Sequence, residues 1–403
     1  MISVAEAIQI VNDKTRSLES ERVELSRALG RYLSEDIVAD TDLPPFDRSQ
    51  MDGYAVRSAD LATGPAKLKI VGESAAGRGW HNELKAGEAV RIMTGAPVPV
   101  GADSVQQVEL TRELDGGNAV EILEPVTLGR SIVKRASEIK KGETVLRAGE
   151  RINAGAVAVL ASFGYATAKV GIRPRVAILA TGTELVPVDQ KPGQDQIRDS
   201  NNFSIAAYAL LAGATSERQP LAGDDIEQLK QQIASAAEQN DIVITSGGVS
   251  VGRYDFTKTV LKELGAEIFF ERIALRPGKP AVFARLPNGT LVFGLPGNPV
   301  SVSVTFNLFA RAAILAMQSA AETGLETGTA VLGKGIKPSK DRESYLPARL
   351  STNENAQLLA EPLKWGGSSD FVGFVRATAL IVVPPTTERL QEGAKVRIVY
   401  LPI

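Results

Sequence analysis

The spacing of hydrophobic positions predicts helix at the start of the chain. Val4, Ala7 and Val11 recur at the spacing of one helix face, and the apolar positions that begin at Leu25 continue the pattern. We therefore expect residues 3–36 to be largely helical. From residue 66 to residue 126 the pattern changes to short β-branched runs separated by Gly, Pro and Asp turns, which predicts a small β-rich domain.

A third pattern begins near residue 172. The continuous apolar run from Val176 to Leu179 is typical of a buried parallel strand, and the segment after Asn201 has helical periodicity. Strand and helix patterns then alternate through residue 322, which predicts an α/β domain with a mostly parallel sheet. Beyond residue 323, short strand-like runs return and predict a C-terminal β-barrel-like domain.

These patterns together predict a multidomain protein of the α/β plus β class. A chain of 403 residues is too long for one hydrophobic core. The expected parts are an N-terminal helical and linking domain (1–42 and 140–171), an inserted β-rich domain (43–139), the central α/β domain (172–322) and the C-terminal β domain (323–403).

Composition limits the partners of the protein. The 45 Lys and Arg residues nearly balance the 47 Asp and Glu residues, for a formal net charge of −2. No overall field attracts such a chain to nucleic acid or to a membrane, so we expect a small-molecule partner. The sequence shows no signal peptide and no window of 18 consecutive apolar residues. We expect a cytoplasmic protein without a transmembrane segment.

Composition also limits the chemistry. The chain has no cysteine, and its one histidine, His81, lies in a Gly-rich polar turn typical of a solvated surface. Thiolate nucleophiles, disulfides and zinc–sulfur sites are thereby excluded. Acid, base or metal-ligand roles then fall to carboxylates, and stabilisation of negative charge falls to Lys, Arg, backbone amides or a bound cation.

Loops that follow the predicted strands carry the candidate chemistry, because ligands bind at the carboxyl ends of strands in open parallel sheets. Glycines at 247, 248 and 252 would let backbone amides approach a phosphate or another oxyanion, unless they serve only tight turns. The cations Arg272, Arg276 and Lys279 suit the same kind of ligand, and a surface basic patch is the alternative.

Carboxylates in these loops would repel an anion unless a cation lay between them. Glu184, Asp224 and Asp255 therefore predict Mg²⁺ held by oxygen ligands, although each could instead cap a helix or lie in a solvated turn. The earlier segment Pro44–Asp60 is rich in Pro, Gly and Asp and is expected to be irregular backbone. Its apolar residues, such as Tyr54, predict an ordered loop that lines a site.

The motifs in their order along the chain resemble the molybdopterin molybdenumtransferase family, which includes bacterial MoeA and the E domain of gephyrin-type proteins. The resemblance covers nearly the whole chain and rests on "FDRSQMDGYAVRSAD", "RIMTGAPVP", "ATGTEL", "TSGGVSVGRYDFTK", "ALRPGKP" and "GLPGNPVS". It implies insertion of molybdate into adenylylated molybdopterin, with release of AMP and molybdenum cofactor. It also implies an α/β domain similar to molybdopterin adenylyltransferase.

The resemblance further implies roles for particular residues. Asp52 and Thr94 match loop residues that the family presents to the active cleft. The residues that match the nucleotide and metal region are Glu184, Asp224, Ser250 and Asp255. The residues that match the region of the pterin phosphate and molybdate are Arg276, Lys279, Ser301, Arg349 and Ser368, and we include Arg272, Pro296 and Pro299 in this substrate-binding set.

Two positions depart from the family pattern. Glu138 stands where the family usually has Asp, and it keeps the charge but adds a methylene. Arg276 replaces the usual Lys and keeps the cation with different hydrogen-bond geometry. Both changes leave the roles of these residues open.

The partners implied by the resemblance are a second copy of the chain in a homodimer and, transiently, molybdopterin adenylyltransferase and molybdoenzymes or their chaperones. Two other functions remain open from the sequence. One is a carrier or scaffold for finished cofactor, which would not need several metal-ligating carboxylates. The other is a nucleotidyltransferase that makes the adenylylated pterin, which would not need the β-rich domain or the "MDGYAV" loop.

Overall fold

The computed structural model describes residues 1–62, 64–221, 225–248, 256–364, 366–386 and 388–402. Internal contacts divide the chain into two compact units. Unit 1 consists of Met1–Glu35, Ala148–Val157 and Thr167–Ile403, and unit 2 consists of Asp36–Arg147 and Ala158–Ala166.

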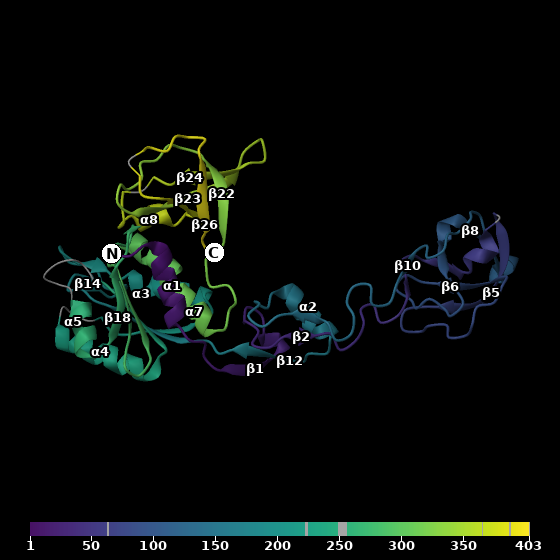
Figure 1. Cartoon of the computed structure of the whole chain (residues 1–403), viewed down its shortest axis with the longest axis horizontal. Coiled ribbons are helices and arrows are strands. Elements are labelled where there is room, and N and C mark those ends of the chain that lie inside the picture. The colour runs from purple at the N-terminus through teal and green to yellow at the C-terminus, as the bar shows by residue number, and fades with distance from the viewer. Residues whose placement is uncertain (63, 222–224, 249–255, 365, 387, 403) are drawn as a thin grey trace. The chain divides into compact units, whose positions relative to one another are not determined.

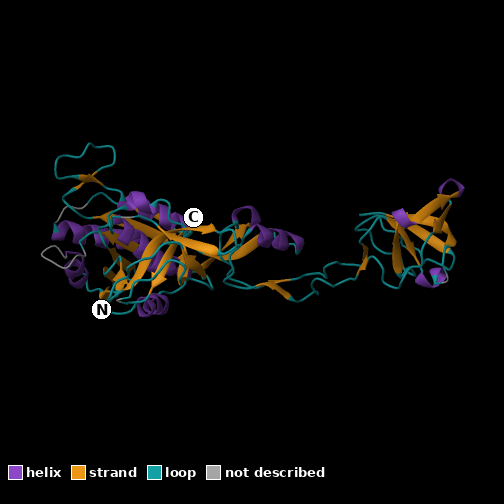
Figure 2. Ribbon diagram, turned by 90° about the horizontal axis from the view of Figure 1, so that it is seen from above, coloured by secondary structure: helices purple, strands orange, loops and turns teal. Residues whose placement is uncertain are grey.

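Unit 2 is built on a six-stranded sheet in the order β7-β4-β6-β5-β9-β8. Strands are drawn in orange in Figure 2. Hydrophobic clusters pack on this sheet, with Tyr54, Val56, Leu68 and Ile122 in one of them and Ala55 in another. The strands are β4 (Gly53–Val56), β5 (Ala66–Ser74), β6 (Glu88–Ile92), β7 (Ser104–Gln107), β8 (Thr111–Leu114) and β9 (Ala119–Ile122). Short pairs join β3 (Arg48–Ser49) to β10 (Ile132–Val133) and β2 (Ile37–Val38) to β11 (Thr144–Leu146).

The expectation of irregular backbone throughout Pro44–Asp60 is wrong for its second half. β4 lies between β7 and β6, and Tyr54 at its centre is 1% exposed. Gly53 permits this pairing, because a Cβ at that position would lie 1.9 Å from the carbonyl oxygen of Gln106 in β7. The glycine therefore serves close approach of two strands instead of a turn.

The N-terminal segment of unit 1 begins as predicted and then departs from helix. Helix α1 (Val4–Lys14) starts at a capping box formed by Ser3 and Glu6. The helix predicted over 3–36 does not continue beyond Lys14. Instead, β1 (Ser20–Glu24) pairs antiparallel with β12 (Thr167–Gly171), and only a 3-10 turn, η1 (Leu25–Arg27), follows it. Helical spacing near Leu25 is thus overridden by pairing with a strand distant in sequence.

The central sheet of unit 1 confirms the predicted α/β domain. Its order is β16-β13-β17-β21-β20-β18. The first four strands are parallel, and β20 runs antiparallel to both of its neighbours, β21 and β18. The strands are β13 (Arg175–Ala180), β16 (Thr215–Arg218), β17 (Ile242–Ser246), β18 (Glu267–Arg272), β20 (Pro280–Arg285) and β21 (Leu291–Leu295). A short parallel pair, β14 (Leu185–Val186) with β15 (Ile197–Arg198), lies beyond β13.

Helices cover both faces of this sheet (Figure 1). One face packs against α1, α3 (Asn201–Leu211) and the continuous helix of α6 (Pro299–Thr305), η5 (Phe306–Ala310) and α7 (Arg311–Met317). The other face packs against α4 (Ile226–Gln239) and α5 (Phe256–Glu263). A further helix, α2, spans Ala154–Ser162.

One described helix, Pro299–Met317, is long and apolar enough to cross a membrane by length and composition. Its most apolar window is 89% buried inside the protein. The apolar side chains of this helix therefore belong to the core of unit 1, where they pack on the central sheet.

The C-terminal part forms a closed five-stranded β-barrel, as predicted. Strand β23 pairs with both β24 and β25, and this double pairing closes the barrel. The barrel strands are β22 (Thr327–Leu332), β23 (Glu343–Thr352), β24 (Leu358–Pro362), β25 (Ala379–Val383) and β26 (Lys395–Tyr400), and a short helix, α8 (Phe371–Phe374), precedes β25. Strand β19 (Leu275–Arg276) pairs with β23 and so joins the α/β domain to the barrel.

Candidate functional site

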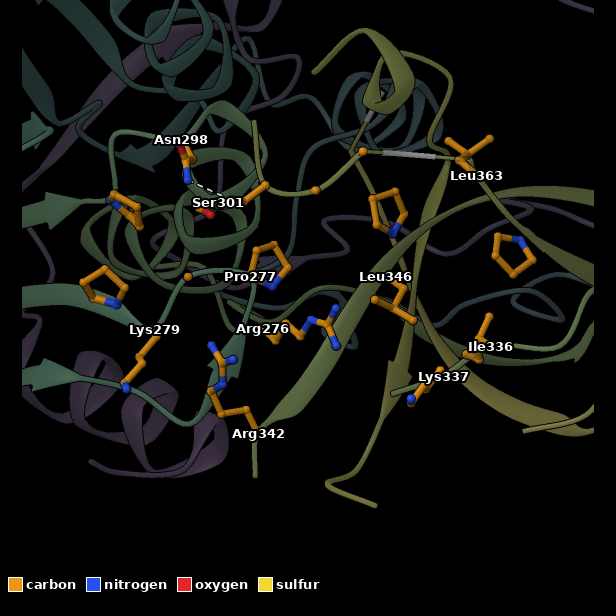
Figure 3. A pocket seen from close by; sticks show the side chains of 18 residues that line it. Arg276, Pro277, Lys279, Asn298, Ser301, Ile336, Lys337, Arg342, Leu346 and Leu363 are labelled. Atoms are coloured by element: carbon orange, nitrogen blue, oxygen red, sulfur yellow. Dashed lines mark hydrogen bonds between the residues drawn. The ribbon is translucent and has the colours of Figure 1, made fainter. Parts of the chain in front are cut away.

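A cavity of about 670 Å³ lies where the α/β domain meets the barrel, and we call it the cationic pocket (Figure 3). Arg276 and Lys279 come from the α/β domain, whereas Lys337 and Arg342 come from the barrel. Among the residues that the structure describes, no carboxylate lines the cavity. Its other lining residues are Pro277, Gly278, Pro280, Pro296, Asn298, Ser301, Ile336, Leu346, Pro347, Pro362, Leu363, Gly366, Gly367 and Ser368.

The four cations of this pocket are largely free of protein anions. Arg342 contacts Asp341 at 3.5 Å, while Arg276, Lys279 and Lys337 form no ion pair within the described part of the chain. Figure 3 shows Arg342 and Arg276 between Lys279 on one side and Lys337 on the other. Four positive groups around one cavity, of which one is paired with a carboxylate, suit the binding of a multiply charged oxyanion.

Backbone pairing fixes the position of Arg276. In the β19–β23 pair, Leu275 is opposite Glu343 and Arg276 is opposite Ser344. The loop then packs tightly on α6, because a Cβ at Gly278 would lie 2.6 Å from the Cγ2 atom of Thr305, and the φ of this glycine is +116°. Glycine is thus required for both conformation and space at this turn.

Asn298 separates the cationic pocket from a second cavity. Its Nδ2 group donates a hydrogen bond to Oγ of Ser368 at 2.8 Å, and the backbone N–H of Val300 donates to the carbonyl of Ser368 at 3.0 Å. The segment around Ser368 is thereby fastened to the start of α6. Because Asn298 lines both cavities, the two sites are neighbours across this hydrogen-bonded bridge.

The second cavity has a volume of about 720 Å³, and we call it the strand-end pocket. It lies at the carboxyl ends of β13, β17 and β21, which contribute Thr181, Ser246 and Gly297 through the strand ends or the loops that follow. This is the edge at which open parallel sheets bind ligands. The remaining lining residues are Glu184, Leu185, Pro192, Gln196, Ile197, Arg198, Asp199, Ser200, Asn201, Gly247, Asn298, Pro299, Ser369 and Phe371.

Gly182 leaves space for the carboxylate of Glu184 in this pocket. A Cβ at Gly182 would lie 2.4 Å from a carboxylate oxygen of Glu184, and the φ of Gly182 is +147°. Any side chain at position 182 would therefore collide with the carboxylate and strain the backbone. The backbone carbonyl of Glu184 accepts a hydrogen bond from Ile197 at 2.8 Å, which holds the loop against β15.

Asn201 joins two of the strand-end loops. Its Nδ2 group donates to Oγ of Ser246 at 2.8 Å and to the carbonyl of Gly297 at 2.7 Å. Its Oδ1 atom is buried and has no hydrogen-bond partner among the described residues, whereas the buried carboxylate of Asp199 accepts from the backbone N–H of Asn202 at 3.1 Å. The amide thus fixes the width of the pocket between β17 and β21.

The donor set of the strand-end pocket suits a hard divalent cation. Glu184 and Asp199 supply carboxylate oxygens, and Thr181 and Ser246 supply hydroxyls, which are the ligand types that Mg²⁺ takes. The residues that the structure describes contain no cluster of three His, Cys, Asp or Glu residues able to hold a metal. Asp224, Ser250 and Asp255, also predicted at this site, lie outside the described residues.

The other predicted substrate-binding residues are divided between several places. Pro296, Ser301 and Ser368 line the cationic pocket with Arg276 and Lys279, whereas Pro299 lines the strand-end pocket. Two cations line neither cavity: Arg272 is exposed at the end of β18, and Arg349 is exposed on β23 opposite Glu361.

Sequence reasoning missed Lys337 and Arg342, although both line the cationic pocket. They lie in "GIKPSKDRESY", a charged stretch between two barrel strands whose pattern is that of a solvated loop. The signal that places them is the pairing of β19 with β23, which brings Glu343 opposite Leu275. No local feature of the sequence encodes that pairing.

Unit 2 carries a separate pair of predicted residues, Asp52 and Thr94. The backbone N–H and the hydroxyl of Thr94 both donate to Oδ1 of Asp52, at 2.7 and 2.9 Å. The backbone hydrogen bond, followed by the hydroxyl bond, lowers the pKa of the Asp52 carboxyl. Asp52 is exposed, so an ionised carboxylate in a fixed orientation faces solvent.

Tyr54 and Glu138, two other residues of unit 2, are bound to side chains within that unit. Buried Tyr54 donates its hydroxyl proton to Glu113, which also pairs with Arg91, and burial together with this bond raises the pKa of Tyr54. Glu138, at the position where the family pattern has Asp, pairs with Arg48 at 3.1 Å. The longer side chain of Glu138 is thus engaged in an ion pair on the surface of unit 2.

Comparison with protein families covers the chain in three segments. Residues 2–164 match the MoeA N-terminal region (domain I and II), residues 177–316 match a probable molybdopterin binding domain, and residues 329–401 match the MoeA C-terminal region (domain IV). Molybdopterin molybdenumtransferase of Bacillus subtilis (strain 168) is 35% identical over 99% of this chain and 94% of its own length. The protein of the same name from Staphylococcus aureus (strain Mu50 / ATCC 700699) is 35% identical over 99% of this chain and 95% of its own length.

Solved structures agree with this relationship. The molybdopterin biosynthesis MoeA protein from Pyrococcus horikoshii OT3 superimposes with a TM-score of 0.85 at 28% identity and full coverage of both chains. A second MoeA structure, from Pyrococcus horikosii, gives a TM-score of 0.79 at 32% identity over 99% of each chain. The identity over the full length, the three matched regions and the common fold show that the chain belongs to the MoeA family of molybdopterin molybdenumtransferases.

Proposed function

We propose that the protein is a molybdopterin molybdenumtransferase, which inserts molybdate into adenylylated molybdopterin and releases AMP and molybdenum cofactor. The names of the full-length relatives support this activity. The structural observation that carries it is the pair of adjoining pockets in unit 1, one surrounded by cations and the other by oxygen donors at strand ends.

Each of the two pockets would bind a different part of the adenylylated substrate. Arg276, Lys279, Lys337 and Arg342 would neutralise molybdate and the pterin phosphate, which are anions. The strand-end pocket would take the adenylyl group, with the bond to be cleaved near the Asn298–Ser368 bridge. Rigid loops around both pockets would hold the reacting groups in position, which supplies much of the rate in reactions that need little covalent protein chemistry.

We further propose that the reaction depends on Mg²⁺, bound by Glu184 together with Asp224 and Asp255. The oxygen donors around Glu184 support this assignment. When bound, the cation would shield the charge of the phosphates. Glu184→Gln should then raise the Mg²⁺ concentration required for half-maximal AMP release, and an unchanged Mg²⁺ titration would remove Glu184 from the ligand set.

We also propose that the protein acts in the cytoplasm as a homodimer and that Asp52 takes part in the reaction. The ionised, oriented carboxylate of Asp52 supports the latter role. Transient contacts with molybdopterin adenylyltransferase and with molybdoenzymes or their chaperones follow from a substrate and product that pass between proteins.

The test of the proposed function is incubation of the purified protein with adenylylated molybdopterin, molybdate and Mg²⁺. We expect AMP to appear in equal amount with molybdenum cofactor. A carrier would bind finished cofactor without releasing AMP, and a nucleotidyltransferase would instead consume ATP and molybdopterin. Either of these results would contradict the proposal.

A further inference from the structure

Phe371 is a large apolar side chain that remains 53% exposed while it lines the strand-end pocket. It is the first residue of α8 and comes from the C-terminal part of the chain, whereas most of the pocket comes from the α/β domain. We propose that Phe371 is a substrate-binding residue that stacks on the adenine ring of the adenylylated substrate. This inference rests on the proposed function, because it concerns the substrate of the same site.

The local structure holds Phe371 in place. The carboxylate of Asp370 accepts hydrogen bonds from the backbone N–H groups of Gly366 at 2.8 Å and Gly373 at 3.0 Å, so it closes the turn on both sides of the aromatic residue. Just upstream, Ser368 is bound to Asn298 and Val300 at the start of α6. Phe371 therefore belongs to a backbone segment held by hydrogen bonds, and such preorganisation lowers the entropic cost of a contact with a ligand.

The composition of the pocket explains why a planar ring is the expected partner. Among the described lining residues, the strongly exposed large apolar side chains are those of Phe371 and Ile197, which is 58% exposed. Phe371 makes no ring contact with another aromatic residue in the described part of the chain. An exposed, rigidly held aromatic face at a ligand pocket can stack on a base without reading its hydrogen-bonding pattern.

The neighbouring cationic pocket indicates which part of the substrate would lie against Phe371. Arg276, Lys279, Lys337 and Arg342 lie on the far side of the Asn298–Ser368 bridge, where molybdate and the pterin phosphate would be neutralised. The adenylyl group, at the other end of the phosphate link, would then extend into the strand-end pocket. Its adenine ring is the part of that group that can bury apolar surface.

Calorimetric titration of the full-length protein with AMP, at fixed Mg²⁺, tests this inference. We expect Phe371→Ala to raise the Kd for AMP by about tenfold, as loss of one stacked base predicts, and Phe371→Trp to retain tight binding. Val375→Ala is the matched control, since Val375 is 77% exposed near the same helix and does not line the pocket. The melting temperature of each variant should match that of the wild type.

Ribose 5-phosphate, which lacks the base, separates stacking from general damage to the pocket. Phe371→Ala should leave its binding unchanged. Equal weakening of AMP and ribose 5-phosphate, unaltered AMP binding in Phe371→Ala, or no AMP binding to the wild type would each overturn the inference. Phe371-dependent AMP binding in a protein that releases no AMP from adenylylated molybdopterin would support the stacking contact and contradict the proposed transferase activity.

Discussion

At the scale of single residues, Asp52 and Tyr54 are two positions apart and have opposite environments. The Asp52 carboxylate is exposed and oriented by Thr94, whereas the Tyr54 ring is 1% exposed in the core of unit 2. We expect Asp52→Asn to lower turnover by at least about tenfold with the melting temperature nearly unchanged. Tyr54→Ala should instead cost about 3–5 kcal/mol of stability, as for other buried aromatic residues.

Turnover and melting temperature measured side by side for the two variants check this prediction. If Asp52→Asn unfolds the protein, or leaves turnover intact, Asp52 is structural. Met51 is another of the apolar residues of Pro44–Asp60 from which an ordered loop was expected, and it is 42% exposed. Burial therefore distinguishes two residues that sequence reasoning treated alike.

The charge state of Asp52 gives a second prediction at this scale. Hydrogen bonds from Thr94 lower the pKa of Asp52 in the folded protein, so the ionised form is favoured there. The corresponding stability is present above the unfolded pKa and is lost as the pH falls through the lower folded pKa. A carboxyl NMR titration should place the midpoint of Asp52 below that of an ordinary aspartate. Thr94→Val should raise this midpoint, and an unchanged midpoint would contradict the role of the hydroxyl.

At the scale of elements, the loop after β13 depends on Gly182. Because a Cβ at this position would collide with the Glu184 carboxylate and strain the backbone, Gly182→Ala should displace Glu184 from the strand-end pocket. We expect AMP release to fall at least about tenfold, a loss of about 1.4 kcal/mol of transition-state stabilisation. Gly324→Ala is the control, since nothing lies within 4 Å of the added Cβ and its φ is not positive. Equal activity of the two variants would mean that the position of Glu184 is unimportant.

Elements with a strong local pattern could be predicted from the sequence, and elements fixed by distant partners could not. The alternation of strands and helices from β13 onward encodes the α/β domain, and the central strands β13, β17 and β21 are nearly continuous buried runs. In contrast, β1 exists through pairing with β12, and β4 through the close approach to β7 that Gly53 permits. Neither contact leaves a signal within a short window of sequence.

At the scale of the whole molecule, the cationic pocket needs both the α/β domain and the barrel. Lys337→Gln and Arg342→Gln should each weaken molybdate binding at least about fivefold, because each removes a charge-assisted contact. Lys340→Gln changes an exposed lysine of the same loop that lines neither pocket and should have no effect. Titration with molybdate at constant ionic strength checks this. Equal affinities for all three variants would show that the barrel does not contribute to the site.

The sequence identified one half of this pocket and not the other. Arg276, Lys279 and Ser301 follow strands of a regular α/β pattern, where strand ends indicate a site. Lys337 and Arg342 lie in the loop between β22 and β23 and enter the site only because β19 pairs with β23. Local sequence patterns therefore identify only the part of this site that comes from the α/β domain.

The expected homodimer is a further prediction at this scale. A symmetric pair is the commonest assembly of soluble oligomers, and light scattering of the purified protein at micromolar concentration should give twice the mass of the 42.8 kDa chain. Full activity in a preparation that remains monomeric would remove the dimer from the proposal.

The most direct test of the transferase function is a single-turnover measurement with adenylylated molybdopterin. With molybdate and Mg²⁺ present, we expect one AMP released for each molybdenum cofactor formed, and we expect Lys337→Gln to slow both products together. Release of neither product by the folded wild-type protein, or AMP release that leaves molybdopterin without metal, would contradict the assignment.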